Sequence, residues 1–531
     1  MREPNKSALD GTVLRNPQKL LVEILSPISD DAEKAAIAHT DLIWQIIFLG
    51  NSGNPKGTEA WKMPSAPNGL FIWTLKMLGM VSILSVTLAA VSLVSGLSAQ
   101  VQDEAFKDAP PGISYSIAPA TKRWKPAKLV KTEAQTVQLL RSVKGVNSKK
   151  INPRSVAAVL GSHQRLVGGT GYLNITSTSA YGTQYAIEVQ FNGHSLELIL
   201  DTGSSDTWAV QTSFSCVDYS GQYLPQSICG FGDTYPGWFQ YGLTDPETHM
   251  LIQYGDGEVV TGPMGYSDVT IGSITVKKQE VCLANTTYWY GNNQTSGLIG
   301  LAFPSLTNAY LGEAGDHDWE NQVKYSPVFT NMVDQGLVDP VFSIAIDRNS
   351  STGMIAFGGI APASGLDWTK TAVLDMVITS VIALPETAYQ YSFYTIIPDG
   401  WFFDQTTNTK KFPYIVDSGT TLNYLPPHLA DAINSAFDPP AVYLWMHGGY
   451  FTECDAIIPD VAIILDGTKF RISPKDLLYR SVVDPLTGLC MTSISDGGAG
   501  PYILGDAFMQ NALVVFDVGG AKMQFIARKY D

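Results

Sequence analysis

The chain has 531 residues, of which 45% are apolar, so it is too long for one small domain and can bury a substantial core. Only 16% of the residues are charged, while 48 are glycine and 30 are proline; this composition argues against disorder and against a helical bundle, and favours a large β-protein. The formal net charge is −15, and residues 171–531 alone carry 14 Lys/Arg against 37 Asp/Glu. Because so acidic a body repels nucleic acid, we expect no nucleic-acid partner.

The N-terminal 99 residues divide into two segments. Residues 77–99 contain an uncharged apolar run that ends in Leu97-Ser98-Ala99, which predicts a signal peptide cleaved before Gln100. The run is also long enough to span a bilayer, so a signal anchor is the alternative, and contact with a membrane follows only from that alternative. In both cases the following part lies outside the cytosol, and we expect a secreted protein, with a vacuolar or membrane-anchored location as alternatives. Residues 1–76 are an N-terminal extension, either a gene-model artefact or a cytoplasmic tail.

Residues 100–169 form a basic block in front of the acidic body. Residues 101–170 hold 12 Lys/Arg against 4 Asp/Glu, and apolar residues recur among the lysines at helix-like spacing. This charge contrast predicts an intramolecular lid, a prosegment that is released when carboxylates become protonated. Lys149-Lys150 is a dibasic processing point, so self-cleavage and cleavage by another protease both remain open.

From about Thr170 the sequence changes to short alternating apolar stretches separated by Gly, Asn and Asp, as in residues 185–200. This pattern is typical of strands and hairpins, and it continues to the C-terminus with one short helical stretch over residues 428–437. The sequence therefore predicts an all-β body.

Two short motifs recur in the same order within this body. Asp201-Thr202-Gly203-Ser204 and Asp417-Ser418-Gly419-Thr420 each follow an apolar run. Each is followed much later by two apolar residues and a glycine, at 298–300 and at 503–505. Two independent elements in one order indicate a duplicated lobe, and we place the lobes at residues 170–340 and 341–531.

The repeated motif suits a reactive carboxylate. Apolar flanks exclude water, glycine permits a sharp turn, and the following hydroxyls can orient the carboxylate by hydrogen bonds. One copy alone would be an ordinary aspartate in a turn. If the two lobes face each other, however, Asp201 and Asp417 share a site where like charges cannot both ionise easily, so the pair holds one proton at acidic pH. One aspartate then deprotonates a water while the other donates a hydrogen bond to the carbonyl under attack, which requires no cofactor and no metal.

In this order, from about residue 180 to the end, the motifs resemble the pepsin-like family of aspartic peptidases, in particular its fungal-type secreted or anchored members. The resemblance implies an all-β, bilobal fold, in which two pseudo-twofold-related, β-barrel-like lobes enclose a cleft. It implies that Asp201 and Asp417 are the catalytic acids and that Ser204 and Thr420 hydrogen-bond to them. It also implies a monomeric endopeptidase that is made as a zymogen, cleaves proteins or peptides at acidic pH and is inhibited by pepstatin-type compounds.

Residues 252–257 resemble the hairpin, called the flap, that closes over substrate in this family. Tyr254 is the expected flap tyrosine beside Gly255, Asp256 and Gly257, and Trp208 is its expected hydrogen-bonding and packing partner. A hairpin tyrosine that merely packs is the alternative. Fungal-type members often carry aspartate at the position of Asp256, so we expect tolerance of lysine before the scissile bond; the alternative role of Asp256 is a hydrogen bond at the flap tip.

The resemblance extends to other positions. Leu298 is expected to pack beneath the first catalytic loop and also to line the substrate pocket, and Thr421 is expected to contact substrate. Asp506 either faces the substrate or has a structural role. In an oxidising compartment the local cysteine pairs are Cys216–Cys229 and Cys454–Cys490, which leaves Cys282 unpaired. The second pair fits the family well and the first loosely, because its loop is longer here. Four sequons predict glycosylation, at Asn174, Asn285, Asn293 and Asn349.

Two other functions compete with this interpretation. A protease-like binding protein without catalysis would usually have lost an aspartate, the glycine after it or the flap tyrosine, and all of these are present. A two-carboxylate glycosidase would leave the duplicated loops and the flap unexplained.

Overall fold

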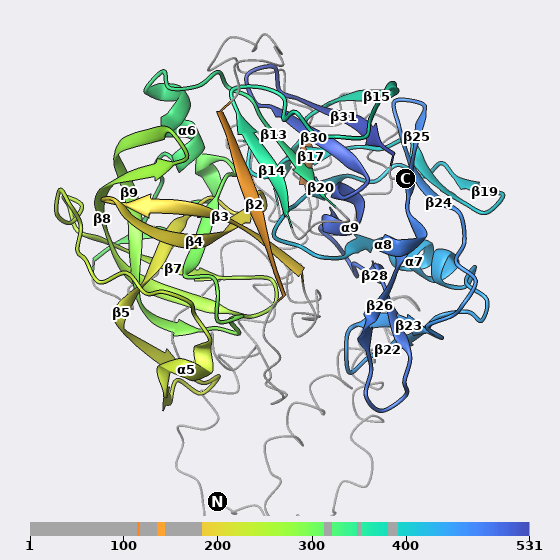
Figure 1. Cartoon of the computed structure of the whole chain (residues 1–531), viewed down its shortest axis with the longest axis horizontal. Helices are drawn as coiled ribbons and strands as arrows, with labels where there is room; N and C mark the ends of the chain where they lie inside the picture. The colour runs from red at the N-terminus through yellow and green to blue at the C-terminus, as the bar shows by residue number, and fades with distance from the viewer. Residues whose placement is uncertain are drawn as a thin grey trace, which may run out of the picture. The chain divides into compact units, whose positions relative to one another are not determined.

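The structure is a computed structural model that describes residues 183–312, 321–347, 352–380 and 391–529, together with two strands upstream, β1 (Ser114–Ser116) and β2 (Gln135–Val143). The expected segments 1–76 and 77–99, most of the basic prosegment, and the sequons at Asn174 and Asn349 lie outside the described residues. In the described part, strands predominate and helices are short, which confirms the all-β class (Figure 1). None of the helices described is long and apolar enough to cross a bilayer.

The first half of the body is built on one long run of hydrogen-bonded strands. Its elements are β3 (Thr183–Phe191), β4 (His194–Asp201), β5 (Thr207–Val217), β6 (Tyr223–Leu224), α5 (Gln226–Cys229), β7 (Thr248–Gln253), β8 (Val259–Ile271), β9 (Ile274–Tyr288), β10 (Gly297–Gly300), η4 (Pro304–Leu306), β11 (Ala309–Leu311), β12 (Gln322–Val323) and α6 (Val328–Asp334).

The second half continues this sheet and adds smaller ones. Its elements are β13 (Phe342–Ile346), β14 (Thr352–Phe357), β15 (Leu366–Asp375), β16 (Ile378–Ser380), β17 (Thr395–Ile396), β18 (Gly400–Phe403), β19 (Thr406–Asn408), β20 (Tyr414–Val416), β21 (Asn423–Leu425), α7 (Pro427–Asn434), β22 (Val442–Leu444), β23 (Gly449–Thr452), β24 (Val461–Leu465), β25 (Thr468–Ile472), α8 (Pro474–Leu477), β26 (Leu478–Val483), β27 (Cys490–Thr492), β28 (Ile494–Asp496), β29 (Tyr502–Leu504), α9 (Asp506–Met509), β30 (Ala512–Asp517) and β31 (Lys522–Arg528).

The two halves repeat one arrangement around the sequence motifs. In the first, β10 lies between β4, to which it is parallel, and β5, to which it is antiparallel, and its register sets Gly300 opposite Asp201. In the second, β29 lies in the same way between β20 and β21. All four residues of β10 and all three of β29 are buried, as expected for a strand enclosed on both sides. The duplicated lobe inferred from the sequence is thus visible as a duplicated strand arrangement.

Strand β2 joins the two halves. It pairs antiparallel with β3 on one side, where Leu140 lies opposite Ala186, and with β14 on the other, where Gln135 lies opposite Phe357. Figure 1 shows β2 running between these strands. The helix-like spacing noted upstream therefore does not produce a helix over Gln135–Val143, because two open strand edges offer this segment a ladder of hydrogen bonds on each side.

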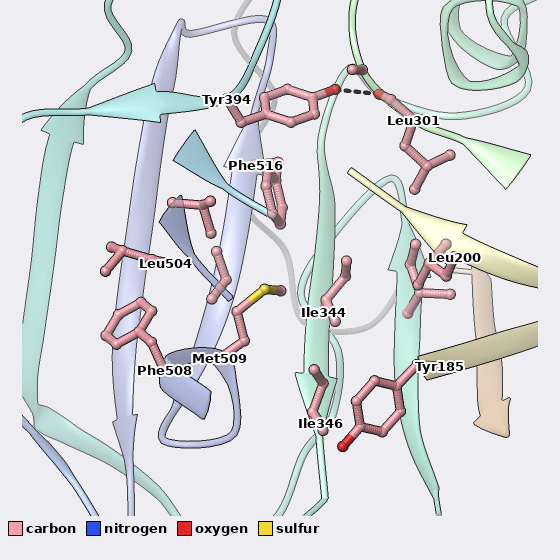
Figure 2. Packing of buried hydrophobic residues seen from close by; sticks show 14 of the residues in the cluster. Tyr185, Leu200, Leu301, Ile344, Ile346, Tyr394, Leu504, Phe508, Met509 and Phe516 are labelled. Carbon is pink, nitrogen blue, oxygen red and sulfur yellow. Dashed lines mark hydrogen bonds between the residues drawn. The ribbon is translucent and has the colours of Figure 1, made fainter. Parts of the chain in front are cut away.

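The helical stretch predicted for residues 428–437 is present as α7. The sequence analysis missed α5, α6, α8 and α9, which have seven residues or fewer and are too short for an apolar period to stand out. The core between the halves is closed by buried side chains from both (Figure 2). Within it, the Tyr394 hydroxyl donates to the Leu301 carbonyl at 2.6 Å, and Phe342 stacks on Phe516 with ring centroids 4.4 Å apart.

Candidate active site

Two turns bring Asp201 and Asp417 together. Asp201 is the last residue of β4, and Asp417 directly follows β20. A Cβ on Gly203 would lie 2.6 Å from Asp417 Oδ1, and a Cβ on Gly419 would lie 2.6 Å from Asp201 Oδ1. Each turn therefore needs its glycine because the carboxyl group of the opposite turn occupies that space. Asp201 and Asp417 are 216 positions apart in the chain, and the fold makes them face each other in one site.

Each carboxyl group is held in the same way by its own turn. Ser204 Oγ donates to Asp201 Oδ2 at 2.5 Å, and the Gly203 N–H donates to Oδ1 at 2.7 Å. In the second turn, Thr420 Oγ1 donates to Asp417 Oδ2 at 2.5 Å, and the Gly419 N–H donates to Oδ1 at 2.8 Å. These donors fix the plane of each carboxyl group.

Thr202 and Ser418 cross between the turns. The Thr202 hydroxyl donates to the Val416 carbonyl at 3.0 Å, and the Ser418 hydroxyl donates to the Leu200 carbonyl at 2.9 Å. Both hydroxyls are buried and also accept a backbone N–H from the opposite turn. Each turn is thus tied to the strand that carries the other aspartate.

The surroundings raise the pKa of Asp201 well above its usual value. Burial is the main cause, and the nearby charge of Asp417 and a hydrogen bond with it act in the same direction. The hydrogen bonds from Ser204 and Gly203 oppose this rise because they favour the carboxylate. A proton is therefore retained between the two aspartates at a pH where an isolated aspartate would have lost it.

The end of β29 and the residues that follow β10 and β29 support the two turns by backbone hydrogen bonds. The Leu301 N–H donates to the Asp201 carbonyl at 2.8 Å, and the Asp417 N–H donates to the Leu504 carbonyl at 3.0 Å. Thr421 is partly buried, and its backbone carbonyl accepts the Ala507 N–H at 3.1 Å. Asp506 is completely buried at the start of α9, and its N–H donates to the Thr420 carbonyl at 2.8 Å. Its burial favours the structural role over contact with substrate.

The β7–β8 hairpin carries Tyr254 at its turn. The Tyr254 N–H donates to the Glu258 carbonyl at 2.9 Å, and the Gly257 N–H donates to the Tyr254 carbonyl at 3.0 Å, with Gly257 at φ 93°. Trp208 Nε1 donates to the Tyr254 hydroxyl at 2.8 Å, so the expected pair is in contact. Burial raises the pKa of Tyr254 well above its usual value, which keeps the hydroxyl protonated.

The other residues expected at the hairpin are placed as follows. Asp256 is partly exposed, and its Oδ1 accepts the Glu258 N–H at 3.2 Å. Gly255 lies beside it in the turn and is also partly exposed. Leu298 is buried in β10 in an apolar cluster with Trp208, and it lies opposite Trp208 in the strand register. Leu298 thus supports the base of the site by packing.

A buried carboxylate that the sequence analysis missed lies just beyond the first turn. Asp206 is fully buried and accepts from the backbone N–H of Asn308 at 3.0 Å, from Asn308 Nδ2 at 2.8 Å and from the Tyr325 hydroxyl at 2.7 Å. Burial raises its pKa, although these donors oppose the rise. One signal in the sequence could have revealed it. Asp206 stands five residues after Asp201, whereas the residue five positions after Asp417 is the apolar Leu422, so the two motifs differ at this point.

Trp289 is a second residue that the sequence did not reveal. It is buried just after β9, and its ring lies against both Trp208 (5.2 Å between centroids) and Tyr254 (5.7 Å). Because it is one of 11 tryptophans and stands outside any repeated motif, nothing in the sequence singles it out.

The cysteines and sequons complete the predicted positions. Disulfides join Cys216 to Cys229 and Cys454 to Cys490, and Cys282 is a buried thiol. Asn285 and Asn293 are both exposed. In the described ranges, no group of three or more His, Cys, Asp or Glu side chains is arranged to hold a metal ion.

Comparison with known proteins gives the following similarities. Residues 183–528 match the family model described as eukaryotic aspartyl protease. A protein from Aspergillus fumigatus, described as a "probable aspartic-type endopeptidase", is 35% identical over 410 residues, which cover 75% of this chain and 89% of that protein. Penicillopepsin-3 from Penicillium janthinellum is 27% identical over 402 residues, which cover 73% and 91%. The crystal structure of an aspartic proteinase from Irpex lacteus is 18% identical, with a TM-score of 0.48 over 65% of this chain and 95% of that one.

Proposed function

Since the chain belongs to the eukaryotic aspartyl protease family and is an aspartic-type endopeptidase, we propose that Asp201 and Asp417 are its catalytic acids. The family predicted from the two repeated motifs is thereby confirmed. The observation that carries the assignment is the mutual approach of the two carboxyl groups, each facing the glycine of the opposite turn. The substrates are proteins or peptides, and cleavage takes place at acidic pH.

The reaction proceeds by attack of a water held between the two carboxyl groups. The pair retains one proton, because burial and the charge of Asp417 raise the pKa of Asp201. The ionised member of the pair takes a proton from the water, and the protonated member donates a hydrogen bond to the scissile carbonyl as negative charge develops on its oxygen. Ser204 and Thr420 hold the carboxyl groups in place, so little rearrangement precedes the attack.

The β7–β8 hairpin serves as the flap in this proposal. Tyr254 presents an apolar ring with a polar end, and the glycines at positions 255 and 257 give the tip freedom to move. Closure over the substrate excludes water from the reacting bond, which strengthens the electrostatic interactions there. Asp256 projects from the same tip and supports the acceptance of lysine before the scissile bond.

An acid-pH proteolysis assay tests the assignment. Purified protein is incubated with a folded substrate protein at pH values from 3 to 7, with and without pepstatin, beside the Asp417→Asn variant. Cleavage that is confined to the acidic range, stopped by pepstatin and absent from the variant supports the proposal. Pepstatin-resistant cleavage, or an Asp417→Asn variant as active as the parent, contradicts it.

We further propose that residues 100–169 are a prosegment and that the protein is a secreted zymogen. Strand β2 supports this, since it belongs to the segment and forms backbone hydrogen bonds with a strand of each half of the body, β3 and β14. Two disulfides and two exposed sequon asparagines suit an oxidising, exported environment. N-terminal sequencing of the active form locates the processing site. A zymogen that stays inactive after both acidification and cleavage at Lys149-Lys150 contradicts the proposal that the prosegment acts as a removable lid.

A further inference from the structure

The position of the flap tyrosine depends on more than its hydrogen bond to Trp208. That bond fixes only the hydroxyl end of the Tyr254 ring. The side of the ring lies against Trp289, edge to face, with an interplanar angle of 78°. Trp289 therefore limits how far the Tyr254 ring can swing sideways while its hydroxyl remains near Trp208.

Trp289 is in turn packed from its other side by Phe231. The two rings are stacked, with centroids 5.8 Å apart and an interplanar angle of 15°. Phe231 also meets Trp208 edge to face at 6.0 Å and Phe214 edge to face at 5.3 Å. The five side chains Phe214, Phe231, Trp208, Trp289 and Tyr254 form one continuous group of rings, which we call the flap cluster. Within the flap cluster, the ring contacts of Phe231 connect it to Tyr254 through the two tryptophans.

The backbone, rather than side-chain packing alone, fixes where Phe231 lies. Phe231 follows Cys229, which is bonded to Cys216 on β5. Around it, the Gly291 N–H donates to the Cys229 carbonyl at 2.9 Å, and the Gly232 N–H donates to the Thr295 carbonyl at 2.9 Å. The segment on either side of Phe231 is thus attached to the segment that follows Trp289.

The glycines on both segments show how close this approach is. A Cβ on Gly232 would lie 2.0 Å from the Gln294 carbonyl oxygen, and a Cβ on Gly291 would lie 2.0 Å from the Gly230 carbonyl oxygen. Gly230 itself has φ 61°, a conformation that residues with a Cβ rarely adopt. No other residue type fits these positions without movement of the backbone. The glycines around Phe231 therefore allow the two segments to pack in direct backbone contact.

We propose that Phe231 is a positioning residue for the flap: held next to the Cys216–Cys229 disulfide, its ring keeps the Trp289 indole against Tyr254 and so helps to fix the position of the flap tyrosine. The inference rests on the proposed function of Asp201 and Asp417. Phe231 touches neither the aspartates nor Tyr254 directly. It acts by filling one face of Trp289, so its loss removes one of the contacts that hold the indole beside the flap.

The test compares three substitutions of Phe231 in the acid-activated enzyme. Phe231→Ala removes the ring, Phe231→Leu keeps apolar bulk without a flat face, and Phe231→Tyr restores the ring. Tyr223→Ala is the matched control, since Tyr223 is an aromatic residue of the adjacent Cys216–Cys229 loop, is 80% exposed and is not part of the flap cluster. For each variant, kcat and KM are measured on a fluorogenic peptide per pepstatin-titrated site, together with the melting temperature and the near-ultraviolet circular dichroism of the aromatic side chains.

We expect Phe231→Ala to lower kcat/KM about tenfold, mainly through a higher KM, and to lose part of the tryptophan signal in the near-ultraviolet spectrum. Phe231→Leu should fall between this variant and the parent, and Phe231→Tyr and Tyr223→Ala should match the parent. If Phe231→Ala does not fold, Phe231→Leu against Phe231→Tyr decides the question. Kinetic constants per active site that equal those of the parent in Phe231→Leu, whatever its melting temperature, overturn the proposal.

The proposed function fails separately from this inference. If the parent enzyme does not cleave the peptide, or if Asp417→Asn cleaves it equally well, the function of the aspartates is wrong. The spectral comparison needs no activity, and an unchanged near-ultraviolet spectrum in Phe231→Ala would show that Phe231 does not hold Trp289 in place.

Discussion

Thr202 and Ser418 hydrogen-bond to each other's backbone across the site: the Ser418 N–H donates to Thr202 Oγ1 at 3.0 Å, and the Thr202 N–H donates to Ser418 Oγ at 3.2 Å. Because each hydroxyl also donates to the strand leading into the opposite turn, the relative position of the two carboxyl groups depends on both residues together. Neither half of the chain can hold this geometry alone.

Substitution of Ser418 tests this dependence. Ser418→Ala leaves the buried Thr202 N–H and the Leu200 carbonyl without their partner, which should cost about 1–3 kcal/mol in the free energy of unfolding. Activity should fall as well, because the turns lose their mutual alignment. Denaturant unfolding and kcat on a peptide substrate measure the two effects. Ser418→Thr keeps the hydroxyl and is the control; an alanine variant that matches it in both measurements contradicts the role given to Ser418.

Asp206→Asn should weaken the link between the first turn and the segment that pairs with the flap. The carboxylate accepts three donors from Asn308 and Tyr325, and an amide would place its own N–H₂ group opposite one of them. Since Asn308 also accepts the Leu251 N–H of β7 at 3.3 Å, the base of the flap loses support. We expect a loss of about 1–3 kcal/mol in unfolding free energy at pH 4. The exposed Asp233→Asn is the control, and equal stability of the two variants would refute this account.

Glu280 should make the fold less stable as the pH approaches neutrality. Burial on β9, assisted by the charge of Asp206, raises the pKa of this carboxyl group from 4.5 to about 7. Because the pKa of Glu280 is higher in the folded than in the unfolded state, the folded state binds this proton more tightly. The resulting contribution to the free energy of unfolding is fully present below about pH 4.5 and is lost as the pH rises through 7. The loss is at most about 3 kcal/mol for this group. Burial raises the pKa of Asp201 as well, with the same sign.

The measurement is the melting temperature between pH 4 and pH 8. Glu280→Gln should flatten the decline above pH 5, whereas substitution of the exposed Glu247 by glutamine should leave the profile of the parent. A Glu280→Gln profile that falls as steeply as that of the parent would show that this carboxyl group is not responsible.

Asp256 should determine how well lysine is accepted before the scissile bond. The parent and Asp256→Ala are compared on two peptides that differ only by lysine or leucine at that position. Loss of the carboxylate removes an attraction for the lysine ammonium group, so the kcat/KM ratio of the lysine to the leucine peptide should fall about tenfold. An unchanged ratio leaves Asp256 with only its hydrogen bond to the Glu258 N–H.

The sequence predicted those features that are local or repeated. Asp201 and Asp417, with their glycines and hydroxyl residues, stand in short motifs, and the repetition itself indicated two similar halves. The disulfides followed from closeness in the chain. The Tyr254–Trp208 contact, over 46 positions, could be expected only through resemblance to a family.

Features that depend on distant partners stayed hidden. Asp206 meets Asn308 and Tyr325 more than 100 positions away, and no spacing rule connects them. Trp289 and Phe231 meet because two glycine-containing segments approach closely, which neither segment reveals by itself. The residues of β2 have a helix-like period and nevertheless form a strand, because the neighbouring edges of β3 and β14 outweigh local preference.

The place of β2 between β3 and β14 has a consequence for biosynthesis. The strand leaves the ribosome before either neighbour, meets β3 after about 40 further residues, and must wait about 210 residues for β14. A ribosome that stalls before β14 therefore carries a nascent chain with one side of β2 exposed as an open edge, to which a chaperone or a second nascent chain can bind.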